Sequence, residues 1–307
     1  MVTHMNRRRF LTISAAFAGA PVLGAVKASA ATFRAQALGA RVTIRLAGPK
    51  QSRASELFKT LAQELRRLEN IFSLYRPESE LSHLNRTGLL KAPSPELREV
   101  LGLSQAVHDA TGGAFDPTIQ PVWALIAASD GPPAKAALAK AWALTGFHRV
   151  VHTDTEVRLA SPEAALTLNG IAQGYITDQL SAFLHRAGFH NVLIDAGEIR
   201  ANGSGMTGSA WKIGISDNNG QIARRLTLHD RALATSSPEG AVQLPGGVAH
   251  ILDTRQKTGA NNWNTVSVSA ENAALADALS TAFTAMTRPE IDRTLILFEN
   301  ARLELCL

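Results

Sequence analysis

Cysteine is almost absent from this chain, since the one cysteine among its 307 residues is Cys306. A lone thiol excludes an intramolecular disulfide and a thiolate metal cluster, and no cysteine stands near the N-terminus for lipid attachment. Long hydrophobic runs are also scarce, because beyond the N-terminal segment no stretch approaches the length of a membrane-spanning helix. Hydrophobic residues still make up 45% of the chain, enough to bury a sizeable core.

Acidic residues are missing from the N-terminal segment, and this gap explains the basic character of the whole chain. The formal net charge is +5, and the cations Arg7, Arg8, Arg9 and Lys27 lie in a segment without Asp or Glu. Without these four residues the net charge falls to +1. The charge balance therefore reflects targeting, and we expect no nucleic-acid partner.

Residues 1–30 are similar to an export signal of the twin-arginine (Tat) type. The arginines precede Phe10 and Leu11, an apolar segment covers residues 13–26, and the small residues Ala28-Ser29-Ala30 follow. This pattern predicts cleavage after Ala30, a periplasmic location, and a mature domain of residues 31–307. The alternative, an uncleaved N-terminal membrane anchor, is disfavoured by the short apolar core, which is rich in Ala and Gly.

The hydrophobic periodicity of residues 31–307 predicts a single α+β domain with antiparallel or mixed sheets and flanking helices. Expected helices begin near Ser52, lie between Ser94 and Gly112, cover residues 133–145, begin at Gly174, and cover residues 271–286. Expected strands cover residues 40–46, 165–168, 191–195, 211–215, 223–228, 232–236, 248–252, 265–269 and 294–298. Neither a repeat nor a low-complexity linker divides the chain.

The stretch from Leu168 to Asp178 predicts a strand, a turn at Asn169-Gly170, and the start of a helix. Glycine allows a backbone to approach a bulky ligand, and the start of a helix presents free N–H groups to an anion. The stretch therefore suits a phosphate-bearing cofactor. A connection that uses glycine only for its turn explains the same pattern, because a lone Gly-x-x-x-Gly is a weak motif.

A second candidate site lies in the helix predicted over residues 271–286. Asp277 and Thr281 are four residues apart, so their oxygens point to the same side of that helix. Two hard oxygen ligands, a backbone carbonyl and waters would make a magnesium site of the kind used with phosphates. A solvated helix face is the alternative, but the apolar surroundings leave Asp277 in need of a partner.

His250 is a third candidate, since a histidine at a strand end can act as a general base near neutral pH. It is one of nine histidines, most of which we expect to be structural or exposed. The chain has no Gly-x-Ser-x-Gly elbow, His-Glu-x-x-His pair or Walker loop, which removes the common hydrolase, zinc-protease and P-loop interpretations.

Taken in order, these motifs resemble those of the ApbE family of FAD:protein FMN transferases. The matching segments are Phe72-Ser73-Leu74-Tyr75 with Ser79 to Ser82 and Asn85, Gly112 to Asp116, Gly170 to Tyr175, His250 to Asp253, and Ala276 to Thr281. Each motif is weak alone, and the resemblance rests on their number and order across nearly all of residues 38–281.

The resemblance implies a T-fold-like domain that binds FAD with Mg²⁺ and transfers FMN to a threonine or serine of a target flavoprotein, releasing AMP. It implies that Tyr75 covers the flavin and that the metal is held by the Gly170 carbonyl, Asp277 and Thr281. Catalysis would use His250 as the base together with Asp277. The other implied cofactor contacts are Leu38, Ala114, Phe115, Asp116, Gln173 and Ile251.

Several departures from the family pattern bear on the cofactor site. Gln173 stands where many relatives have lysine, which removes a positive charge, and residues 195–198 carry one glycine where many have two. Leu38-Gly39-Ala40 replaces Met-Gly-Thr, and the segment after His250 is longer than usual. Two alternative functions stay open: a magnesium-dependent FAD pyrophosphatase that yields FMN and AMP, and a flavin-binding carrier without turnover. Any contact with a membrane is expected only through the signal or the target protein.

Overall fold

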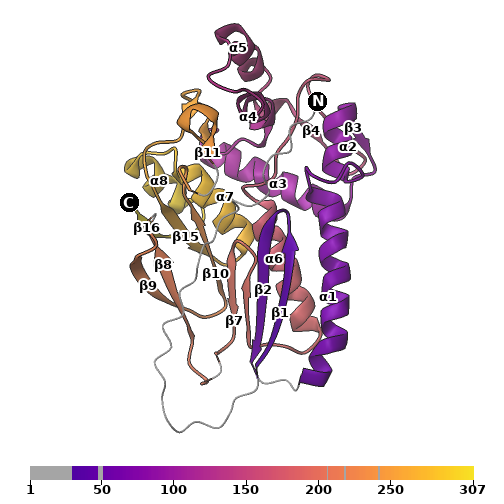
Figure 1. The fold of residues 1–307 in the computed structure, drawn as a ribbon, viewed down its shortest axis with the longest axis vertical. Coiled ribbons are helices and arrows are strands. Elements are labelled where there is room, and N and C mark those ends of the chain that lie inside the picture. Colours follow the sequence, from indigo (N-terminus) through magenta and orange to yellow (C-terminus); the bar gives the residue numbers. More distant parts are fainter. Residues whose placement is uncertain (1–29, 48–50, 206, 218, 241–242) are drawn as a thin grey trace.

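The computed structural model describes residues 30–47, 51–205, 207–217, 219–240 and 243–307, so all of the predicted signal except Ala30 falls outside the described residues. Its centre is a seven-stranded antiparallel sheet in the order β1-β2-β6-β7-β10-β15-β16 (Figure 1). The strands are β1 Ala30–Ala37, β2 Ala40–Ala47, β6 Val192–Asp195, β7 Ile199–Asn202, β10 Arg231–Ser236, β15 Val266–Ala270 and β16 Arg302–Cys306. The single α+β domain predicted from the sequence is confirmed.

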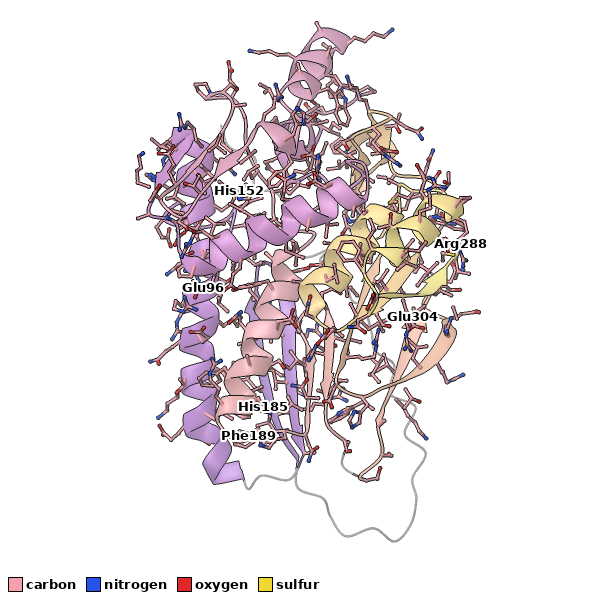
Figure 2. All side chains as sticks on the ribbon, turned by 180° about the vertical axis from the view of Figure 1, so that it is seen from behind. Glu96, His152, His185, Phe189, Arg288 and Glu304 are labelled. Carbon is pink, nitrogen blue, oxygen red and sulfur yellow. The ribbon has the colours of Figure 1, made fainter. Side chains whose placement is uncertain are left out.

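Three helices cover one face of this sheet: α1 Gln51–Phe72, α6 Ala172–Arg186 and α7 Ala273–Phe283. Figure 2 shows this face, with α3 Pro95–Ala110 crossing the end of the helical layer. Arg67 of α1 bonds the carboxylate of Glu96 on α3 at 2.7 Å, which ties the crossing helix to the layer. Apolar side chains from helices and sheet form the main core between them.

The opposite face of the sheet is covered by the hairpin of β8 Trp211–Ser216 and β9 Ile222–Leu228. Successive side chains of β6 point to opposite faces of the sheet. Ile194 belongs to the main core, whereas Leu193 packs with Trp211 in a second core. The indole N–H of Trp211 donates to the carbonyl of Asn202 at 2.9 Å. The sheet is therefore buried on both faces in this region.

Shorter elements complete the domain. They are the helices α2 Glu80–Thr87, α4 Gln120–Ala127, α5 Lys135–Ala143 and α8 Arg288–Ile296; the 3-10 turns Pro117–Ile119, Phe147–Arg149 and Pro245–Gly247; and the strands β3 Leu89–Lys91, β4 Val151–His152, β5 Glu156–Arg158, β11 Gln243–Leu244, β12 Val248–Ala249, β13 Leu252–Asp253 and β14 Thr258–Gly259. In the described residues no helix has the length and apolar content needed to cross a bilayer.

Three predicted strands are wrong or interrupted. Residues 165–168 form no strand, because the amide of Asn85 bonds both the N–H and the carbonyl of Leu166 and replaces a strand partner. Residues 294–298 include the end of α8, whose start is fixed by Pro289 and by Glu290 accepting from the N–H of Thr287 at 2.6 Å. The strand predicted over 248–252 is broken at His250 and Ile251, which lie between β12 and β13.

Candidate functional site

The site begins where α6 packs against the start of α7, at Gly174. A Cβ added to Gly174 would lie 2.3 Å from the carbonyl oxygen of Ala273, so only glycine fits this contact. The N–H of Gly174 donates to Asp277 Oδ2 at 3.1 Å. The close packing of the two helices therefore brings the Gly170 turn next to the predicted metal-binding helix.

Asp178, one turn further along α6, holds the start of α7 in place. Its carboxylate accepts from the N–H groups of Ala273 at 2.9 Å and of Ala274 at 3.0 Å, which are free donors of the first helical turn. Burial raises the pKa of Asp178 to about 6, against the opposing effect of these hydrogen bonds. Arg200 Nη1 lies 3.9 Å from Asp178 Oδ1 and supplies a nearby positive charge.

The three predicted metal ligands lie together at this junction. A Cβ on Gly170 would lie 2.9 Å from Thr281 Oγ1, so the turn and the hydroxyl are in direct contact. Thr281 is one helical turn from Asp277, and Ser236 Oγ from β10 lies 3.4 Å from Thr281 Oγ1. The structure thus brings the Gly170 turn, the hydroxyl of Ser236 and the helix that carries Asp277 and Thr281 together from three separate segments.

Two buried carboxylates dominate the electrostatics of the junction. Asp277 is 3% exposed and Glu198, which follows the turn between β6 and β7, is 5% exposed. Burial raises the pKa of Asp277. Burial, and then the charges of Asp277 and Asp195, raise the pKa of Glu198 well above its ordinary value. Such a pair stays ionised only if a cation compensates it.

These oxygens fit a magnesium ion. Mg²⁺ prefers hard oxygen ligands and keeps several waters or substrate oxygens, so it needs few protein ligands. Within the described ranges no three His, Cys, Asp or Glu side chains converge as a ready metal cluster. A cation here would therefore be held by Asp277, Thr281 and the Gly170 carbonyl, and would complete its shell with water and phosphate oxygens.

Glu198 was missed by the sequence reasoning. The only signal was a carboxylate inside the apolar pattern of residues 192–201, directly after a turn of Ala196 and Gly197. Gln173 contacts the turn before Glu198, because a Cβ added to Gly197 would lie 3.2 Å from Gln173 Oε1. Gln173 therefore packs on the turn that carries Glu198.

Glu69 joins Leu38, a predicted cofactor contact, to Arg76, the residue after the predicted contact Tyr75. Leu38 lies in the β1–β2 turn with φ of 47° and donates its N–H to Glu69 Oε1 at 3.2 Å. Arg76 Nη2 bonds the other oxygen of Glu69 at 2.8 Å. Tyr75 is 57% exposed, as a ring that covers a ligand face requires.

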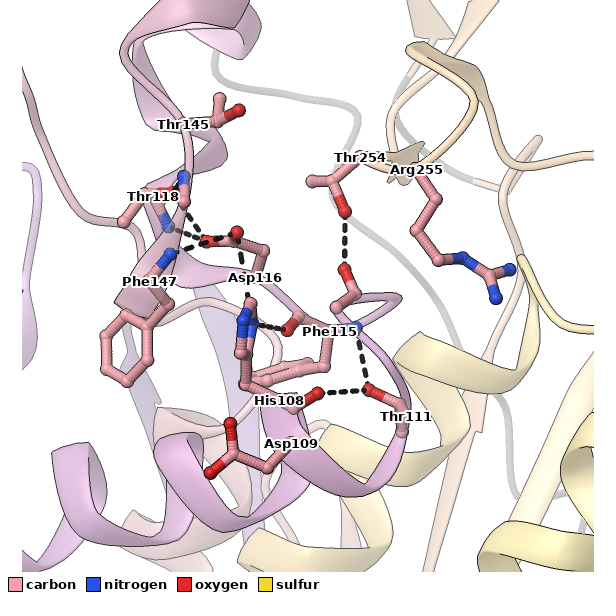
Figure 3. Close-up of polar contacts among 12 residues, drawn as sticks. His108, Asp109, Thr111, Phe115, Asp116, Thr118, Thr145, Phe147, Thr254 and Arg255 are labelled. Atoms are coloured by element: carbon pink, nitrogen blue, oxygen red, sulfur yellow. Dashed lines mark hydrogen bonds and ion pairs between the residues drawn. The ribbon is translucent and has the colours of Figure 1, made fainter. Parts of the chain in front are cut away.

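The predicted contacts Ala114, Phe115 and Asp116 lie in the loop between α3 and the 3-10 turn Pro117–Ile119, and Figure 3 shows Phe115 and Asp116. Ala114 and Phe115 are each 5% exposed. Asp116 accepts from the N–H of Thr118 at 2.8 Å and from the N–H of Phe147 at 3.2 Å. Its carboxylate is thus engaged in holding two loops together, and any ligand contact from this segment would come mainly from the backbone.

His250 and Ile251 lie on the loop between β12 and β13, and both are half-buried. The N–H of His250 donates to the carbonyl of Pro238 at 3.1 Å, and Ile251 accepts from Ala260 at 2.9 Å. Further along the same segment, Thr254 Oγ1 donates to the carbonyl of Gly113 (Figure 3). The His250 segment is therefore joined to the loop that carries Ala114, Phe115 and Asp116.

A cleft of about 370 Å³ lies beside this loop. Gly112, Arg255, Glu290 and Leu297 are among its lining residues. None of the predicted site residues lines this cleft.

The sequence model of the ApbE family matches residues 38–303. A FAD:protein FMN transferase of Chlamydia muridarum is 28% identical over 249 residues, which is 77% of this chain and 78% of the relative. The corresponding Chlamydia pneumoniae protein is 29% identical and covers 72% of this chain and 75% of its own length. The flavin transferase ApbE from Vibrio cholerae superimposes with a TM-score of 0.80 over 90% of this chain and 93% of that structure, at 23% identity.

Proposed function

Since the chain belongs to the ApbE family, we propose that it is a FAD:protein FMN transferase that attaches FMN to a threonine or serine of a target flavoprotein. The observation that carries this proposal is the junction where the Gly170 turn meets Thr281 and the buried carboxylate of Asp277, beside the buried acid Glu198. The two Chlamydia relatives are FAD:protein FMN transferases, which agrees with this proposal.

In the proposed reaction, the hydroxyl oxygen of the target attacks the phosphorus on the FMN side of the FAD pyrophosphate. The new O–P bond forms as the bond from that phosphorus to the bridging oxygen breaks, and AMP leaves. Mg²⁺, when bound, would neutralise negative charge on the pyrophosphate oxygens. Asp277, Thr281 and the Gly170 carbonyl would hold it.

Proton transfer in the proposed reaction falls to His250. Its half-buried position on the loop next to the Gly113 segment suits a group that meets the target hydroxyl at the edge of the site. Neutral imidazole would accept the hydroxyl proton during attack. Exposed Tyr75 would cover the isoalloxazine ring, and Gln173 and Leu38 would border the cofactor.

Incubation of the protein with FAD, Mg²⁺ and a candidate target protein tests the proposal. Flavin fluorescence that remains on the denatured target band supports transfer. Release of free FMN without a labelled band would instead favour the pyrophosphatase, and unchanged FAD would favour the carrier.

Asp277→Asn should abolish Mg²⁺-dependent flavinylation, lowering its rate by about 100-fold or more, because the buried carboxylate is the only charged ligand in the proposed set. In-gel fluorescence over time measures this loss. Asp292→Asn changes an exposed carboxylate of α8 and should react at the rate of the unmodified protein. Full activity of the Asp277→Asn variant would overturn the site assignment.

We also propose that the protein works in the periplasm after Tat export. The support is the twin-arginine segment, and cleavage after Ala30 would remove only the first residue of β1. N-terminal sequencing of protein from the periplasmic fraction tests this, with Ala31 expected as the first residue. A full-length protein confined to the cytoplasm would contradict the proposal.

A further inference from the structure

Glu198 is a buried acidic side chain that the proposed reaction does not yet use. It is 5% exposed, and the N–H of Thr235 bonds its carboxylate. Its second oxygen, Oε2, is buried and has no hydrogen-bond partner among the described residues. An unbonded carboxylate oxygen in a dry interior is costly, so a buried acid of this kind calls for a ligand.

Two sets of contacts connect Glu198 with the residues of the proposed cation site. Thr235, which bonds Glu198, directly precedes Ser236, and Ser236 Oγ lies 3.4 Å from Thr281 Oγ1. On the other side, the side chain of Gln173 packs on the turn before Glu198, and the next residue, Gly174, donates to Asp277. Glu198 thus occupies the space between β10 and the start of α6.

The charges around Glu198 are of one sign. Within the described part of the chain, the charged groups that act on it most are Asp277 and Asp195, both acidic. The nearby arginines interact with other acids. The charges of Arg45 and Arg41 lower the pKa of Asp195, and the charge of Arg200 lowers that of Asp178, in each case against the effect of burial. Glu198 and Asp277 therefore form a pair of buried acids that no cation from the described part of the chain compensates.

We propose that Glu198 is a second carboxylate of the divalent-cation site, which holds the cation together with Asp277 through its free oxygen. This inference rests on the proposed function for the presence of a cation, and adds to it a residue that the family resemblance did not imply. A divalent ion would satisfy the free oxygen and balance two negative charges at once.

The test compares Glu198→Gln with the unmodified protein in cation binding, without FAD or target. Glutamine keeps the shape of the side chain and removes its charge. The melting temperature is measured with EDTA and with increasing Mg²⁺, and Mn²⁺ binding is followed by electron paramagnetic resonance of the free ion. Asp195→Asn is the matched control, because it removes a half-buried carboxylate from the same strand end, where the charges of Arg45 and Arg41 oppose the effect of burial on its pKa.

We expect Glu198→Gln to melt in EDTA at or above the temperature of the unmodified protein, since it loses a buried acid without a partner. Its apparent Kd for Mg²⁺ and Mn²⁺ should rise on the order of tenfold or more, because one of two nearby negative charges is gone. Asp195→Asn should keep the unmodified affinity within about threefold.

Two outcomes would overturn the inference. If Glu198→Gln binds both cations as the unmodified protein does, Glu198 is no part of the site, although the proposed magnesium site can stand. If Asp195→Asn weakens binding equally, the effect is one of general charge and not of Glu198. A failure of the unmodified protein to bind either cation would overturn the magnesium part of the proposed function as well.

Discussion

At the scale of single residues, the candidate site depends on two glycines. In each, neighbouring atoms occupy the space that a Cβ would need. Gly174 lets the backbone of α6 meet the backbone of α7, and Gly170 lies against the hydroxyl of Thr281. These contacts decide where Asp277 and Thr281 stand relative to the turn. The turn at Gly170 lies against Thr281, which agrees with the proposed role of Gly170 as a carbonyl ligand of the metal.

Gly174→Ala should lower the free energy of unfolding by about 3 kcal/mol or more, because the new Cβ meets backbone that cannot move without separating two helices. Urea unfolding followed by circular dichroism measures the loss. Gly102→Ala is the matched control in helix α3: its Cβ would have no neighbour within 4 Å, so we expect a gain of up to about 1 kcal/mol. Equal stability of the two variants would contradict the close packing.

At the scale of elements, the start of α7 is held by a carboxylate from α6. Asp178 takes the place of a local cap for the N–H groups of Ala273 and Ala274, while Asn272 bonds the N–H of Leu275 at 2.8 Å. A helix end secured by another helix fixes the rotation of α7, and with it the direction of Asp277.

The stability of the protein should depend on the ionisation of Asp178. Its pKa in the folded protein is about 6, above the ordinary value of 3.8, so the folded state binds this proton more tightly than the unfolded chain. The contribution of Asp178 to the free energy of unfolding is therefore present below pH 4 and is lost as the pH rises to about 6.

Between pH 4 and 6 the free energy of unfolding of the unmodified protein should fall through the ionisation of Asp178. In Asp178→Asn this fall should be smaller by about 2 to 3 kcal/mol. The variant should also be less stable at pH 5 by about 1 kcal/mol, because an amide has one acceptor oxygen for the two N–H groups. Urea unfolding across this pH range gives both quantities. Parallel pH profiles for variant and unmodified protein would exclude Asp178 as the titrating group.

At the scale of the whole molecule, the sheet separates two cores, and the candidate site uses only one of them. The helical face carries α6 and α7, whereas the β8–β9 hairpin and Trp211 cover the other face. Figure 2 places His185 and Phe189 at the far end of α6, away from Gly174 at its start. The oxygens of the candidate site thus lie at one end of the helical layer.

Trp211→Ala should lower the free energy of unfolding by about 3 to 5 kcal/mol, through the loss of a large buried side chain. Because Trp211 lies on the face opposite α7, the rise in melting temperature caused by Mg²⁺ should equal that of the unmodified protein. Thermal unfolding with and without Mg²⁺ measures both effects. Loss of the Mg²⁺ response in this variant would show that the two faces are coupled.

Much of the fold was predictable because hydrophobic alternation and caps are local signals. The strands β2, β6, β10 and β15 and the helices α1 and α7 follow directly from such patterns, whereas β1 and β7 were not predicted. The two failed strand predictions have different causes. At residues 165–168 a side chain from Asn85, far along the chain, replaced the strand partner, and at 294–298 the capping box of Thr287 and Glu290 outweighed a β-branched run.

The sequence by itself determined the α+β class, the family resemblance, and the pairing of Asp277 with Thr281, since helical spacing places those two oxygens on one face. The tertiary structure alone decided what surrounds them. Only packing of α6 on α7 and of β10 beside the β6–β7 turn brings Gly170 to Thr281 and buries Glu198 beside Asp277. Burial and the sum of nearby charges depend on distances between remote segments, which no local pattern of residues records.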